Sequence, residues 1–109
     1  EEKPLPSRVG YMLRNYGIQG VLEKVKGVVF GRAKDYSEKE KEELNRIILN
    51  VIRDEFKVSD IPVIVDVDFG HTDPKLILPL GCMVSLNHSN SARAVIKDNG
   101  YTASGIFTL

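Results

Sequence analysis

The residues of this sequence that could do acid–base chemistry centre on His71, which follows Gly70 shortly after an apolar run that ends at Val67. Residues 63–67 are mostly β-branched, a composition typical of a buried strand. Gly70, Asp73 and Pro74 are turn residues, so the strand is expected to stop near Gly70. This places an imidazole on a loop at the end of a strand, where catalytic groups often lie.

Other candidate side chains have competing interpretations. Asp66 and Asp68 are two residues apart in the same run, so both carboxylates are expected on one side of a strand. They are either a metal-binding or general-base pair, or the polar face of a half-exposed strand. His88 lies in a polar turn and is interpreted as solvated, and its separation from His71 matches no zinc motif. Cys82 has no basic neighbour and is interpreted as a core residue.

A nucleophile to accompany His71 is missing from the sequence. No serine occupies a Gly-x-Ser-x-Gly turn, and there is no phosphate-binding loop. The chain therefore offers one acid–base residue, and neither a metal nor a cofactor is expected.

Composition narrows the class of protein. Lys plus Arg and Asp plus Glu each number 15, so the net charge is zero, unlike that of most nucleic-acid-binding domains. The sequence has no signal peptide or membrane span, and its single cysteine permits no internal disulfide. We expect a cytoplasmic protein that binds neither nucleic acid nor a membrane.

The clearest predicted element is a helix over residues 38–56. Ser37-Glu38-Lys39-Glu40 forms a capping box. Apolar residues then follow at helical spacing, namely Leu44, Ile47, Ile48, Val51, Ile52 and Phe56. A helix over residues 8–16 is also predicted, with Ser7 as N-cap and Gly17 as its stop. A second short helix is predicted over residues 18–25.

The remaining pattern is rich in strands. Residues 27–32 and 63–69 are predicted to be parallel strands joined by a right-handed crossover through the long helix. Residues 82–87 and 92–97 are predicted to form a hairpin. The last nine residues are a final strand, a disordered end or a tail that contacts a partner. The fold class is therefore α/β with a mixed sheet, and 109 residues suffice for one domain over 1–109.

Several segments match, in order, a pattern found in one enzyme family. They are Glu1-Glu2-Lys3-Pro4, Leu13-Arg14, Gly17-Ile18-Gln19-Gly20, Gly27-Val28-Val29-Phe30-Gly31-Arg32, Ile61-Pro62, Asp68-Phe69-Gly70-His71-Thr72-Asp73-Pro74 and Leu78-Pro79-Leu80-Gly81. Together, over residues 1–86, they resemble the C-terminal domain of serine LD-carboxypeptidases. That family includes murein tetrapeptide carboxypeptidases and microcin C immunity peptidases. The Glu-Glu-Lys-Pro and Phe-Gly-His-Thr segments resemble the microcin branch more closely.

The resemblance implies a site and a mechanism. The family uses a Ser-Glu-His triad, and its histidine corresponds to His71, the implied general base. The implied serine and oxyanion-hole donors lie in an N-terminal domain that this chain lacks. The implied glutamate precedes residue 1, and Glu1 or Glu2 would take its place only if the alignment shifts. Thr72 and Asp73 either brace the His71 loop or simply form a turn.

The resemblance also implies a fold, partners and substrates. The implied fold is a swivelling β/β/α-type domain, the C-terminal half of a two-domain peptidase that commonly forms homodimers. Murein tetrapeptides and microcin-like peptide–nucleotide conjugates both remain open as substrates. We expect an excised half that is inactive alone and exposes an apolar face. The alternative is a non-catalytic binding or interaction module that shares the fold. A nucleophile serine and a glutamate encoded upstream of Glu1 would favour the enzyme.

Overall fold

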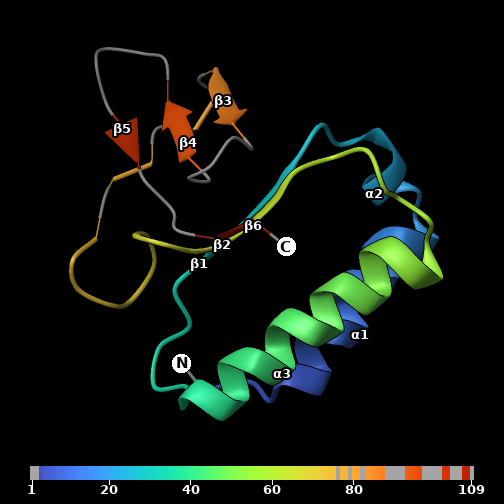
Figure 1. Ribbon diagram of the computed structural model, residues 1–109, viewed down its shortest axis with the longest axis horizontal. Helices are drawn as coiled ribbons and strands as arrows, with labels where there is room; N and C mark the ends of the chain where they lie inside the picture. The colour runs from blue at the N-terminus through green and yellow to red at the C-terminus, as the bar shows by residue number, and fades with distance from the viewer. Residues whose placement is uncertain are drawn as a thin grey trace. The chain divides into compact units, whose positions relative to one another are not determined.

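Helices dominate the first half of the chain and strands the second half (Figure 1). The computed structural model describes residues 3–75, 77–78, 80–81, 83–87, 93–96, 102–103 and 107–108. The chain divides into two compact units. Glu1–Lys26 and Asp35–Ile61 form the first, called here the helical unit. Gly27–Lys34 and Pro62–Leu109 form the second, called the sheet unit.

The helical unit opens with α1 (Pro6–Ile18) and α2 (Val21–Lys24). The predicted cap at Ser7 is wrong, because α1 begins two residues earlier than predicted, with Leu5 as N-cap and a proline in the first turn. Proline presets the helical φ and lacks an N–H that would go unpaired there. The predicted stop at Gly17 is also wrong. Gly17 is buried inside α1, where a Cβ would lie 2.3 Å from Cζ of Phe56.

The long predicted helix is present, with a change of winding near its end. It comprises α3 (Glu38–Leu49) followed directly by the π-helix η1 (Asn50–Glu55). The predicted cap is confirmed, because the Glu40 N–H donates to Ser37 Oγ at 3.2 Å. In Figure 1, α3 lies alongside α1. The buried side chains of this unit are Pro6, Leu13, Leu22, Leu44, Ile48, Val51, Ile52, Val58 and Ile61.

The sheet unit contains a three-stranded mixed sheet in the order β1-β2-β6. Its strands are β1 (Val28–Gly31), β2 (Val63–Val67) and β6 (Phe107–Thr108). The predicted parallel pairing of the first two is confirmed, and β6 joins β2 antiparallel (Figure 1). β2 ends at Val67, earlier than predicted. Near this end Asp66 has a φ of +62°, and the register with β1 shifts between Val29 and Gly31.

A second sheet has the order β3-β4-β5. Its strands are β3 (Val84–Asn87), β4 (Arg93–Ile96) and β5 (Thr102–Ala103). The predicted hairpin is confirmed by the antiparallel pairing of β3 with β4. The strand interpretation of the chain end is confirmed at β5 and β6.

The result is a small mixed α/β fold, as the sequence predicted. The swivelling β/β/α arrangement and a single domain over 1–109 stay predictions. Among the residues that the structure describes, no helix combines the length and apolar character that a membrane span requires.

Candidate functional site

His71 lies on the loop that follows β2, as the sequence predicted, and its side chain is exposed. The strand ends at Val67, and the chain reaches the imidazole through Gly70, whose φ is +113°. Glycine adopts this conformation without the strain that a side chain would bring. A Cβ at Gly70 would lie 3.9 Å from the Arg32 carbonyl oxygen, so the loop passes beside the end of β1.

Arg32, directly after β1, contacts the loop on both sides of His71. Its Nη2 donates to Oδ1 of Asp68, three residues before the histidine. Its Nη1 donates to the backbone carbonyl of Asp73, two residues after it, at 3.3 Å. The Arg32 backbone N–H also donates to the Val67 carbonyl at 2.9 Å. One residue therefore ties the end of β2 and both sides of the loop to β1.

The Arg32 guanidinium also faces Asp66 and Asp68, the two aspartates that the sequence analysis considered as a functional pair. Asp68 forms an ion pair with Arg32, and Oδ1 of Asp66 lies 3.9 Å from its Nε. Within the described ranges, no group of three or more His, Cys, Asp or Glu side chains could hold a metal ion. We therefore interpret the two carboxylates as ion-pair partners of the Arg32 guanidinium rather than as metal ligands.

Phe69 anchors the loop from the inside. Its side chain packs against the buried Ile64 and Val67 of β2. Its backbone meets β1 at Gly31, where a Cβ would lie 2.6 Å from the Phe69 carbonyl oxygen. Such a distance leaves no room for a side chain, so a glycine is required there for the loop to pass this close to β1.

Thr72 and Asp73 behave differently from each other. Oγ1 of Thr72 is buried and makes no hydrogen bond with the described residues. The Asp73 side chain is 85% exposed and lies 3.5 Å from Nζ of Lys75. Asp73 thus braces the loop through its backbone carbonyl, and its peptide bond to Pro74 is cis.

The other sequence candidates fall outside the described residues. These are His88, Cys82, Glu1 and Glu2. Sequence reasoning missed Arg32 as part of the site. The signal was available, because the carboxyl ends of neighbouring parallel strands meet at one sheet edge, so a residue just after β1 meets residues just after β2.

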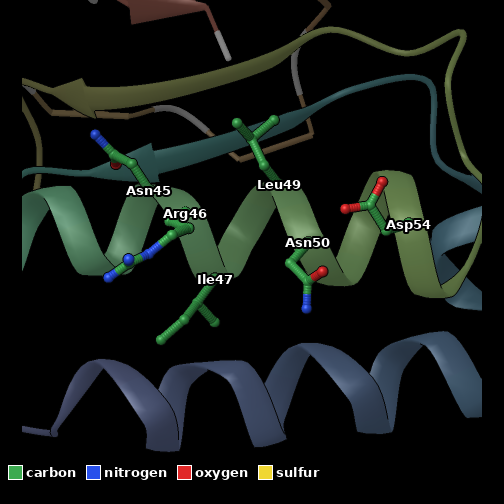
Figure 2. Close-up of a pocket in the computed structure, with 6 residues that line it drawn as sticks. All are labelled: Asn45, Arg46, Ile47, Leu49, Asn50 and Asp54. Carbon is green, nitrogen blue, oxygen red and sulfur yellow. The ribbon is translucent and has the colours of Figure 1, made fainter.

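The helical unit carries a separate open hollow of about 640 Å³ on α3 and η1 (Figure 2). It is lined by Asn45, Arg46, Ile47, Leu49, Asn50 and Asp54. In Figure 2, Ile47 points toward α1, where a Cβ on Gly10 would lie 2.8 Å from Cγ2 of Ile47. These six lining residues include no histidine, cysteine or serine.

The clearest electrostatic pair of the helical unit joins Arg14 and Glu55. Nε and Nη2 of Arg14 donate to the two carboxylate oxygens, each at 2.8 Å. These hydrogen bonds lower the pKa of Glu55 below its ordinary value of 4.5.

A second group of the helical unit with a shifted pKa is Tyr36. Burial, with the nearby charge of Glu40, raises the pKa of the Tyr36 hydroxyl above 10.0. This hydroxyl donates to the Pro4 carbonyl.

Comparison with protein families matches residues 1–86 to the LD-carboxypeptidase C-terminal domain. The chain belongs to this family. The family match confirms the resemblance seen in the sequence. The family is one of serine peptidases, so this LD-carboxypeptidase C-terminal domain is part of a peptidase. The matched residues include β1, Arg32, β2 and the His71 loop. No curated protein matches the chain.

Proposed function

We propose that this domain supplies the histidine of a serine-type carboxypeptidase that cleaves L,D-peptide bonds. His71 is the general base of the triad. The observation that carries the proposal is the coincidence of family and geometry. The family match includes the Gly70-His71 segment, and His71 is exposed on a braced loop at the carboxyl end of β2. An exposed imidazole on a loop that rigid elements hold is suited to proton transfer.

The reaction follows from triad chemistry. The His71 imidazole takes the proton of the serine hydroxyl as the serine oxygen attacks the scissile carbonyl carbon. The resulting imidazolium then gives that proton to the leaving amine as the C–N bond breaks, which releases the terminal D-amino acid. Water hydrolyses the acyl-enzyme by the same two proton transfers in turn. A glutamate orients the ring and stabilises its positive form.

The serine, the oxyanion-hole donors and the glutamate come from a nucleophile domain, the first partner of this chain. Asp66 and Asp68 do not take the place of the glutamate, because Arg32 already engages both.

An apolar run beyond the His71 loop supports docking of such a nucleophile domain. Its exposed members are Ile77, Leu78, Leu80, Met83 and Val84. Exposed apolar residues gathered in one segment are typical of an interaction surface.

The substrate is a murein tetrapeptide or a microcin-like peptide–nucleotide conjugate, and the enzyme works as a cytoplasmic homodimer.

The test uses the complete enzyme, with this domain and its nucleophile domain. Release of D-alanine from an L,D-linked tetrapeptide is measured beside cleavage of a peptidyl-nucleotide analogue. Turnover of one substrate that collapses in His71→Ala supports the proposal and selects the substrate class. Turnover unchanged in His71→Ala, or no turnover of either substrate by the folded enzyme, overturns it.

A further inference from the structure

We propose that Arg32 is a positioning residue that fixes the His71 loop through the shape of its guanidinium group, an inference that rests on the proposed role of His71. The loop leaves β2 after Val67 and contains no regular structure through Pro74. A loop of this kind samples many conformations unless its ends are tied. The charge and the geometry of Arg32 supply the ties.

The ties are placed on both sides of the histidine. Arg32 Nη2 holds the Asp68 carboxylate on the near side, and Nη1 holds the Asp73 carbonyl, at 3.3 Å, on the far side. Four residues of the chain lie between these two contacts, and His71 is one of them. One rigid planar group therefore sets the span of the segment that carries the imidazole.

The Arg32–Asp68 contact is protected from solvent more than a surface ion pair would be. The side chains of Arg32 and Asp68 are each only 24% exposed. Arg32 itself is fixed at its backbone, because its N–H donates to the Val67 carbonyl at 2.9 Å. The pairing of β1 with β2 thus fixes the position of Arg32, and the hydrogen bonds of its side chain fix the loop relative to these strands. A partly buried charged hydrogen bond of this kind is stronger than a neutral or fully exposed one.

Lysine cannot replace this group. The guanidinium presents several N–H donors in a fixed plane, so it can serve two acceptors that lie in different directions. An ammonium group is a point charge on a flexible stem, and it would neutralise the aspartates without fixing the span. The Arg32→Lys substitution therefore separates charge from geometry. A residue that merely balances charge would tolerate it, and a positioning residue would not.

The chain offers a matched control in Arg53. This half-buried arginine also bridges two acceptors, donating to the Val58 carbonyl at 2.7 Å and the Ile61 carbonyl at 2.8 Å. It lies in the helical unit, and neither of its partners belongs to the His71 loop. Arg53→Lys removes the same kind of two-acceptor bridge at a place away from the His71 loop. It therefore shows how much of any change in loop motion or kcat comes from a general loss of stability.

The first arm of the test measures the loop directly and needs no activity. Backbone ¹⁵N relaxation is recorded on the chain for wild type, Arg32→Lys and Arg53→Lys. We expect faster internal motion at residues 69–73 in Arg32→Lys alone. Unchanged relaxation at those residues in Arg32→Lys would overturn the inference, whatever the enzyme does.

The second arm measures steady-state kinetics of the complete enzyme. We expect kcat to fall about 10²-fold in Arg32→Lys with KM little changed, because misplacing a catalytic group costs a factor of this order. Arg53→Lys is expected to keep the kcat of wild type. An active wild type, an inactive His71→Ala and a fully active Arg32→Lys would overturn the inference and leave the proposed function standing. A wild type inactive on both substrates would instead overturn the proposed function, and with it the positioning role.

Discussion

The backbone of Phe69 passes so close to Gly31 that a Cβ on the glycine would lie 2.6 Å from the Phe69 carbonyl oxygen. This contact joins the last residue of β1 to the loop that carries His71. A backbone atom cannot rotate away as a side chain can, so the absence of a side chain at Gly31 sets how near the loop approaches the sheet. The candidate site therefore depends on a glycine that takes no part in its chemistry.

Gly31→Ala is expected to lower the free energy of unfolding by about 1–3 kcal/mol, the usual cost of forcing an atom into a filled space. Urea denaturation measures this loss. Gly27→Ala is the matched control before β1, because its Cβ would meet Cδ1 of Leu86, the far end of a flexible side chain, at 2.3 Å. An equal or greater loss for Gly27→Ala would show that the backbone contact at Gly31 is not the deciding one.

A second glycine substitution tests the packing of α1. Alanine in place of glycine inside a helix normally stabilises it by about 1 kcal/mol. At Gly17 we expect the opposite, because the new methyl group would lie 2.3 Å from Cζ of Phe56 in its partly buried ring. Thermal and urea unfolding of Gly17→Ala measure the effect. Asn15→Ala on the exposed side of α1 serves as control and should be neutral or slightly stabilising, and a stabilised Gly17→Ala would contradict the packing described.

The cap of α3 should contribute measurably to stability. Ser37→Ala removes the acceptor of the Glu40 N–H and is expected to cost about 1 kcal/mol. Ser37→Asp keeps an acceptor at the same position and should recover most of the loss. If both variants unfold at the same denaturant concentration as wild type, the hydrogen bond contributes nothing to folding.

Acid should weaken the pairing of Arg14 with Glu55. Hydrogen bonds from Arg14 hold the pKa of Glu55 below 4.5, so the folded state favours the ionised carboxylate. A folded pKa below the unfolded one gives stability that is present above the unfolded value and lost as pH falls through the folded value. A ¹³C titration of the Glu55 carboxyl group should therefore have its midpoint below 4.5. In Arg14→Gln the midpoint should move up toward the ordinary value, and a midpoint that stays in place would contradict this cause.

The sequence predicted those elements whose signals are local. The capping residues at Ser37 and the β-branched run of β2 each specify their own structure, and both elements begin at the expected residue. The start of α1 was missed because two competing N-terminal signals overlap, and the proline at position 6 prevailed over the serine at position 7. The sequence predicts a helix stop at Gly17 because the packing partner of this glycine, Phe56, is remote in the sequence.

The candidate site was predicted only in part for a similar reason. A histidine after a strand can be found from neighbouring residues, whereas its supports depend on strand pairing. Arg32 and Asp68 are 36 residues apart, and only the register of β1 with β2 brings them together. The conformation of Asp66, with its φ of +62°, also arises from tertiary structure, since a strand pattern predicts extended backbone there.

The central claim is that His71 acts as the general base of an LD-carboxypeptidase. Its most direct test is kcat/KM for release of the terminal D-amino acid by the complete enzyme, measured for wild type and His71→Ala at equal folded concentration. Loss of a triad member predicts a fall of about 10⁴-fold or more. A value for His71→Ala equal to that of wild type would contradict the account.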